Sequence, residues 1–198
     1  MDLVSTLGLA LGASWASGIR LYASVLTLGL LGRFAGLDLP GSLSAVETPW
    51  VMGLAAVLVV VEFVADKVPL VDTGWDAVQT FARVPAGAAI AALALGDYDP
   101  GWQLAAVLLG GGAALSAHGT KAATRLAVNA SPEPVSNVVV STAEDGLAVG
   151  AVLAGVFLPV LALAGVALAV GASVWFLPRI ARALRRLRRR GRPRQNTV

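Results

Sequence analysis

The sequence predicts an all-α protein, a polytopic transmembrane helix bundle of roughly five to six spans or half-spans with broken helices. The 198-residue chain is 57% hydrophobic and 14% charged, whereas an average soluble domain is about half apolar and about a quarter charged. Its apolar residues also occur in long runs and not in amphipathic stripes, and residues 146–178 contain no charge. Because a bilayer core of about 30 Å needs about 20 apolar residues per span, this distribution indicates a membrane protein.

The first apolar run extends from Leu3 to Leu31. A straight helix of about 29 residues, at about 1.5 Å per residue, would be about 43 Å long, which exceeds the hydrocarbon layer. We expect the run to break near Ser17-Gly18, because small residues and the charge of Arg20 coincide there.

A loop, a span, an interfacial helix and a half-span are predicted to follow. Residues 34–49 are rich in Gly, Pro and Ser and predict a loop. The second span begins at Trp50, a residue suited to an interfacial anchor, and ends near residue 65. Over 72–83, aromatic and aliphatic residues recur every three positions, as in a short helix lying in the interface. Residues 84–95 are apolar but too few for a full span, which predicts a half-span or a helix extended by its neighbours.

Two longer segments complete the predicted bundle. A third long run begins at Trp102 and continues to about residue 125. The Pro-containing stretch after it predicts a new helix, with Ser131 as N-cap and Pro132 at the first helical position. Residues 147–177 are apolar with Pro159 near the middle, which is too long for one span and indicates a tight helical hairpin or a kinked pair.

Positive charge is concentrated at the C-terminus. Nine arginines lie within residues 179–198, so the net charge of +3 conceals an excess of acidic residues over 1–178. We expect a single transmembrane domain over 1–178 and an Arg-rich tail over 179–198 that lies in the cytoplasm against anionic head groups of membrane lipids. The tail lacks interleaved aromatic residues, so no nucleic-acid partner is expected. The absence of cysteine excludes disulfides and thiolate metal sites.

Two segments share a pattern that suggests an internal repeat. In both Gly12–Arg20 and Ala113–Lys121, a stretch rich in small residues is followed by a polar residue, a glycine, one intervening residue and a basic residue. Many transporters consist of two such halves, often of inverted topology, with the substrate site at broken helices between them. The halves would be 1–96 and 97–178. Sequences rich in Gly and Ala also align by composition alone, which leaves the repeat open.

The few charges within the apolar segments are the candidates for function. A charge facing lipid costs about 2.5–3.5 kcal/mol, so Arg20 should face a partner or a watery cavity. It would serve an anion or proton pathway, or form a structural ion pair with Glu62 or Glu144. Glu62 and Asp66 share a helical face at the end of a span and could relay protons or hold a cation, or form an ordinary solvated helix end.

The second candidate region follows the third long run. His118, Lys121 and Arg125 share one helical face, and the helix start at Ser131 offers free N–H groups to an anion. A single histidine with scattered carboxylates does not make a metal site, and no cofactor is expected. The candidate substrate- or ion-binding residues are Ser17, Arg20, Glu62, Asp66, His118, Lys121, Arg125, Ser131, Glu133, Asn137, Glu144 and Asp145.

The ordered motifs of the chain resemble those of the domain-of-unknown-function 4126 family of small bacterial membrane proteins. The motifs that carry the resemblance are Ala16-Ser17-Gly18-Ile19-Arg20-Leu21-Tyr22, Glu62-Phe63-Val64-Ala65-Asp66-Lys67-Val68-Pro69, His118-Gly119-Thr120-Lys121 and Ser131-Pro132-Glu133-Pro134-Val135-Ser136-Asn137, followed by Glu144-Asp145. The resemblance covers nearly the whole chain apart from the tail. It implies a multi-pass protein of the bacterial plasma membrane and carries no established activity.

Three functions are compatible with this sequence. The first is a small transporter or channel, which could act as a homo-oligomer, for an anionic solute or lipid phosphate coupled to protons or a cation through intramembrane carboxylates. The second is a structural or partner-binding membrane protein whose buried charges only lock helices together. An intramembrane lipid-modifying enzyme is a weaker hypothesis, because no nucleophile–base pair or metal motif occurs at a recognisable spacing. We therefore expect no enzymatic activity.

Overall fold

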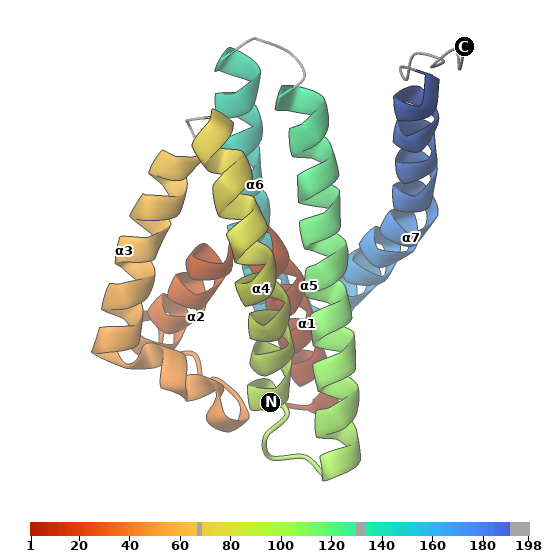
Figure 1. Ribbon diagram of the computed structural model, residues 1–198. Helices are drawn as coiled ribbons and strands as arrows, with labels where there is room; N and C mark the ends of the chain where they lie inside the picture. The colour runs from red at the N-terminus through yellow and green to blue at the C-terminus, as the bar shows by residue number, and fades with distance from the viewer. Residues whose placement is uncertain (67–68, 130–133, 191–198) are drawn as a thin grey trace, which may run out of the picture.

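The computed structural model describes residues 1–66, 69–129 and 134–190, and within them the chain is α-helical with no strand. Seven α-helices and one 3-10 helix occur in these ranges (Figure 1). They are α1 (Leu3–Ile19), α2 (Leu21–Ala35), η1 (Gly41–Glu47), α3 (Pro49–Ala65), α4 (Pro69–Ala94), α5 (Pro100–Asn129), α6 (Pro134–Phe157) and α7 (Pro159–Arg190). The predicted all-α bundle is confirmed.

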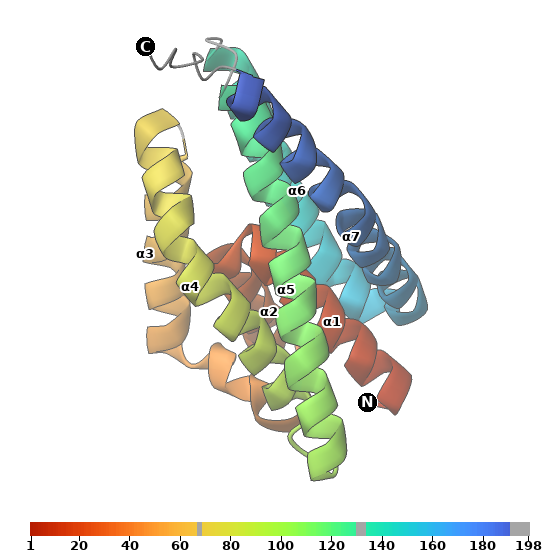
Figure 2. The same cartoon turned by 45° about the vertical axis from the view of Figure 1, so that its right-hand side comes forward.

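The first apolar run breaks at Arg20, which confirms the predicted interruption of this run. Arg20 has a non-helical backbone (φ −141°, ψ 86°) between α1 and α2. Its N–H donates to Ala16 O, and its carbonyl oxygen accepts from the backbone N–H and the hydroxyl of Ser24. The chain turns back at this point, so α1 and α2 form a hairpin whose tip lies in the interior while α2 returns toward η1 (Figures 1 and 2).

Helix α1 is the centre of the bundle. It packs against α4, α5, α6 and α7, and most of its residues are buried. Small residues allow this close packing, because a Cβ added at Gly12 would meet the backbone of Gly155 in α6. A Cβ added at Gly18 would likewise meet Ala117 of α5. The predicted halves 1–96 and 97–178 are therefore interlocked, since α1 of the first lies among helices of the second.

The predicted interfacial helix over 72–83 is wrong as a separate element. It is the first part of α4, one continuous helix that accommodates Pro85 in its interior, so 84–95 is not a half-span and the alternative of a helix extended by its neighbours is confirmed. Asp76 and Arg83, which lie within the segment expected at the interface, are buried and paired with each other. The predicted loop over 34–49 also contains a helix, η1, which is bent by 67° from α3.

The last third of the chain forms a hairpin, as predicted. Helix α6 ends at Phe157 and α7 begins at Pro159, and the two run in opposite directions from this joint (Figure 1). Helix α7 passes through Pro178 and continues to Arg190, so the first part of the Arg-rich tail extends the helix. The predicted N-cap at Ser131 lies outside the described residues.

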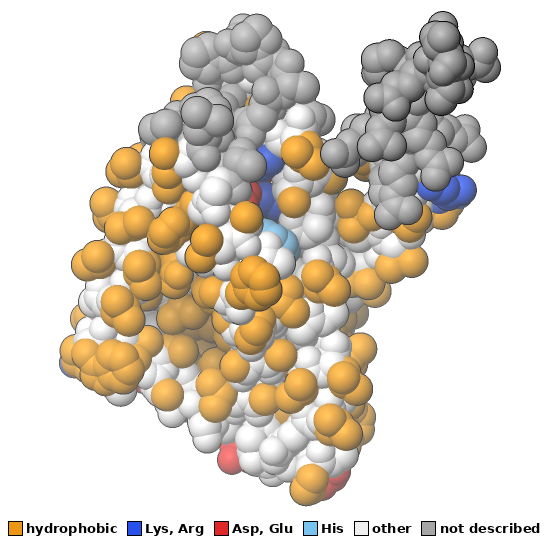
Figure 3. All heavy atoms as spheres, viewed as in Figure 1, with side chains coloured by type: hydrophobic (Ala, Val, Ile, Leu, Met, Phe, Trp, Pro, Cys, Tyr) orange, Lys and Arg blue, Asp and Glu red, His pale blue; other side chains and the backbone are white. Residues whose placement is uncertain are grey.

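The helices and the surface are those of an integral membrane protein. Among the described residues, three helices are long and apolar enough to cross a membrane, or four if the bent pair η1–α3 is one span, and α1 and α2 are shorter apolar helices. Leucine, valine and phenylalanine side chains are exposed over most of the surface, as Figure 3 shows for one face. The start of α1 and the end of α7 lie at opposite ends of the molecule (Figure 1).

The two helices that carry the repeated pattern run in the same direction. Gly110 of α5 lies against Ser14 of α1, and further along both helices Ala114 lies against Gly18. An inverted repeat would place these helices in opposite directions. The pattern therefore does not mark an inverted pair at α1 and α5, and the backbone that breaks at Arg20 is continuous at Lys121.

Candidate functional site

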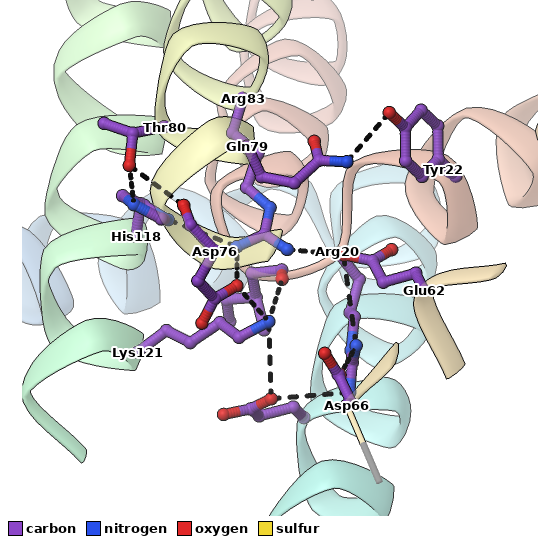
Figure 4. Close-up of polar contacts among 12 residues, drawn as sticks. Arg20, Tyr22, Glu62, Asp66, Asp76, Gln79, Thr80, Arg83, His118 and Lys121 are labelled. Atoms are coloured by element: carbon purple, nitrogen blue, oxygen red, sulfur yellow. Dashed lines mark hydrogen bonds and ion pairs between the residues drawn. The ribbon is translucent and has the colours of Figure 1, made fainter. Parts of the chain in front are cut away.

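Charged side chains from five parts of the chain meet inside the bundle (Figure 4). Arg20 enters from the tip of the α1–α2 hairpin, and the end of α3, the first half of α4, the second half of α5 and the middle of α6 supply the rest. All of them are less than a tenth exposed. These residues are Arg20, Glu62, Asp66, Asp76, Arg83, Lys121, Arg125 and Glu144, and together we call them the charge ring.

The first half of the ring joins α4 to α5 through α3 and the hairpin tip. Arg83 Nη2 lies 2.5 Å from Glu62 Oε1, and the same carboxylate oxygen lies 3.9 Å from Arg20 Nη1. Arg20 Nη1 donates to Asp66 Oδ2. Arg125 Nη2 approaches that Asp66 oxygen at 3.5 Å. Cations and carboxylates therefore alternate along this half.

The second half closes the ring through α6. Arg125 binds Glu144 through two nitrogens, Nη2 to Oε2 at 2.8 Å and Nε to Oε1 at 3.2 Å. Lys121 Nζ lies 3.7 Å from Glu144 Oε2 and 3.1 Å from Asp76 Oδ1. Arg83 Nη1 donates to the same Asp76 oxygen at 2.8 Å, which returns to the starting residue. Each ring cation thus has at least two ring carboxylates, and each ring carboxylate has at least two ring cations.

Arg20 and Glu144 are the two best-connected members. Arg20 Nη2 also reaches Glu144 at 3.4 Å and donates to the hydroxyl of Ser141 at 2.9 Å. Arg20 Nε pairs with Asp145 at 2.8 Å, outside the ring. Glu144 therefore contacts three cations, and the described cluster as a whole contains four cations and five carboxylates.

His118 lies beside the ring on α5. Its Nε2 is 2.7 Å from the hydroxyl of Thr80, which also lies 3.0 Å from the backbone oxygen of Asp76. Its Nδ1 is 3.2 Å from Arg83 Nη1, so the histidine contacts a cation of the ring. In Figure 3 the histidine and nearby basic side chains are visible through an opening in the apolar surface.

The structure brings together eight of the residues selected from the sequence. They are Arg20, Glu62, Asp66, His118, Lys121, Arg125, Glu144 and Asp145. Ser17 is bonded elsewhere, since its hydroxyl donates to Ser14 O within α1. Ser131 and Glu133 lie outside the described residues; Asn137 lies in α6, and its side chain is outside the described part.

Sequence reasoning missed Asp76 and Arg83 as members of the site. They are seven residues apart, so they fall on one face of a helix, and this spacing was the available signal. A single long helix over 69–94 would have been needed to use it. Among the described residues, no group of three His, Cys, Asp or Glu residues is arranged to hold a metal ion. The ring carboxylates are instead held by cations.

The comparison with known proteins identifies a family and no relative of known activity. The family model described as domain of unknown function (DUF4126) matches residues 7–179, which include every helix of the ring. No curated protein and no solved structure matches the chain.

Proposed function

The chain belongs to the domain of unknown function 4126 family, and we propose that it is a small transporter or channel for an anionic solute or a lipid phosphate. Transport is coupled to protons or a cation through the carboxylates of the charge ring. The observation that carries the proposal is the closed ring itself, which lies inside an integral membrane protein at the tip of a helical hairpin.

The energetics favour a function for the ring over a purely structural role. Buried ion pairs are weak contributors to stability, because well-packed apolar residues in their place are often neutral or stabilising by about 1–4 kcal/mol. Ionisable residues inside a membrane typically mark substrate, ion or proton pathways. A bundle that needed only stability would be served as well by apolar contacts at these positions.

The geometry also suggests how anion binding and protonation are linked. Glu144 neutralises Arg20, Lys121 and Arg125 at once. A proton on Glu144 removes this shared counter-charge, and the three cations then favour a bound oxyanion. Loss of the proton restores the ion pairs and displaces the anion. Binding of a proton and binding of an anion are therefore cooperative.

Reconstitution into liposomes tests the proposal. We expect the protein to carry phosphate or a small carboxylate down an imposed proton gradient, and Lys121→Ala to abolish this flux in a folded protein. The control exchanges a ring pair, Arg125→Glu with Glu144→Arg, and keeps the net charge. If the ring only holds the helices together, this exchange restores both the stability and the flux that single substitutions lose. Absence of flux for a panel of oxyanions at any gradient would overturn the proposal.

The structural alternative has one observation in its favour, the complete pairing of the ring. It predicts that Lys121→Ala and Arg20→Ala both fail to fold. We also propose that the protein is not an enzyme, because the Thr80 hydroxyl that His118 Nε2 contacts is also bonded to the backbone oxygen of Asp76 within its own helix, and His118 Nδ1 faces the cation of Arg83 and not a carboxylate that would orient it as a base. Covalent turnover of an added lipid would contradict this.

We further propose that the C-terminus lies in the cytoplasm of a bacterial cell, with the Arg-rich tail on anionic lipids. The positive-inside rule supports this orientation. The opposite end of the molecule, where η1 and the α4–α5 connection lie (Figure 1), is mainly acidic. Its charged residues between the end of α2 and the start of α5 are Asp38, Glu47, Asp97 and Asp99 against Arg33. Reporter fusions to either end of the chain test it, and equal activity of both fusions in the cytoplasm would contradict the opposite placement of the ends.

A further inference from the structure

Helix α4 carries a second row of polar residues that the ring does not account for. Trp75, Gln79 and Arg83 follow one another at intervals of four residues and therefore share a face. Each has a buried polar atom without a hydrogen-bond partner among the described residues, namely Trp75 Nε1, Gln79 Oε1 and Arg83 Nε. We call these residues the α4 stripe. Such a group costs about 1–3 kcal/mol when it stays unsatisfied, so three on one face need an explanation.

The middle residue of the stripe cannot be satisfied by turning its amide. Gln79 is only 3% exposed, and its Nε2 donates to the hydroxyl of Tyr22 on α2 at 2.9 Å. In the reversed orientation the carbonyl would accept from Tyr22, and the amide N–H groups would lose their acceptor. One polar group of Gln79 therefore lacks a partner in either orientation.

The inner end of the stripe is a member of the charge ring. The two terminal nitrogens of Arg83 bind Glu62 and Asp76, which leaves its Nε outside these pairs. Figure 4 shows Gln79 and Tyr22 beside Arg83 at the edge of the ring. The outer end is Trp75, in the second turn of α4. Helix α4 begins at the end of the molecule where α7 also ends (Figure 1).

We propose that the α4 stripe lines a hydrated path that leads from this end of the molecule to the charge ring. Its two N–H donors and its amide acceptor suit water and a small solute that both accepts and donates hydrogen bonds, such as a protonated oxyanion. The other face of α4 is of a different kind, since Val78 is 66% and Phe81 is 85% exposed among apolar neighbours. The use of the path for transport rests on the proposed function, whereas its hydration does not.

Single cysteines test the path without knowledge of the substrate. The chain has no cysteine, so each variant carries one thiol. A thiol reacts as the thiolate, which requires water, and a membrane-impermeant sulfonated methanethiosulfonate therefore reports hydration. Gln79→Cys is placed in the stripe, and Val78→Cys is its matched control on the lipid-facing side of the same turn. Val198→Cys marks the side of the membrane on which the C-terminus lies.

We expect Gln79→Cys in sealed vesicles to react at least about tenfold faster than Val78→Cys, and only from the side marked by Val198→Cys. Equal rates at positions 78 and 79, or no reaction at 79 while Val198→Cys reacts, would overturn the path. If Gln79→Cys does not elute as a single folded species, Trp75→Cys provides the same measurement. Flux by the unsubstituted protein is measured separately. Labelling of Gln79→Cys without flux would support the hydrated path and refute transport. Flux without labelling would support transport and refute the path.

Discussion

Breaking one ion pair from its two ends should have very different consequences. Arg125 and Glu144 form the best-aligned pair of the charge ring, with contacts of 2.8 and 3.2 Å. Arg125→Gln leaves three described cations facing five carboxylates, so negative charge is stranded in the interior. We expect the free energy of unfolding to fall by about 3–5 kcal/mol, as when one partner of a buried pair is removed. Glu144→Gln leaves four cations and four carboxylates, and its amide oxygen still accepts from Arg125.

The loss for Glu144→Gln should therefore be close to that of one ordinary hydrogen bond, about 0.5–1.5 kcal/mol. Both variants are measured by titrating the purified protein in mild detergent with sodium dodecyl sulfate and following the fluorescence of the five tryptophans. The unsubstituted protein gives the reference curve. If Glu144→Gln is as damaging as Arg125→Gln, charge balance does not control the stability of the site, and the explanation in terms of excess carboxylate fails.

Two further predictions concern the packing of α1. Gly18→Ala places a Cβ against Ala117 of α5 and should lower the free energy of unfolding by about 1–3 kcal/mol. Its control, Gly53→Ala, faces open space and should change this free energy by less than about 0.5 kcal/mol. A Gly18→Ala protein as stable as the unsubstituted one would contradict this contact. Ser14→Ala removes the 2.7 Å hydrogen bond to Gly87 O. In the same titration it should lower the free energy of unfolding by about 0.6 kcal/mol, the average for such bonds in membranes. A loss above about 2 kcal/mol would show that Ser14 does more than bridge α1 and α4.

The membrane class and the helix breaks were predictable because they depend on composition and local chemistry. Long apolar runs require lipid, and the coincidence of small residues with Arg20 marks an interruption of the helix. Pro159 separates α6 from α7 for a local reason as well, because proline has no N–H to donate to the preceding turn. These features do not depend on which helices are neighbours.

The partners within the charge ring could not be predicted, because they depend on the tertiary arrangement. Arg20 was expected to pair with Glu62 or Glu144, and both lie within 4 Å of its guanidinium. Its nearer partners are Asp66 and Asp145, which the sequence did not single out for it. Side chains far apart in the chain cannot be matched by spacing, because spacing reports only contacts within one helix.

The error at α4 has a related cause. Polar residues over 72–83 have the composition of a surface helix, and burial is assigned from composition when the neighbours are unknown. In the structure Arg83 is fully buried, because Glu62 and Asp76 of two different helices neutralise it. A buried charge is therefore recognised only together with its partners.

The placement of the ring favours a transporter over a channel. On the side of the ring toward the start of α1, fully buried apolar residues such as Leu9, Leu28 and Leu95 fill the space between the hairpin and α4. A path through this end requires the α1–α2 hairpin to move. We expect Leu28→Cys to be inert to an impermeant thiol reagent at rest, and to react from the side opposite to the Val198→Cys mark when a proton gradient and a transported anion are present. Reaction at the same rate without the gradient would indicate a permanently open channel, and no reaction during measured flux would refute movement of the hairpin.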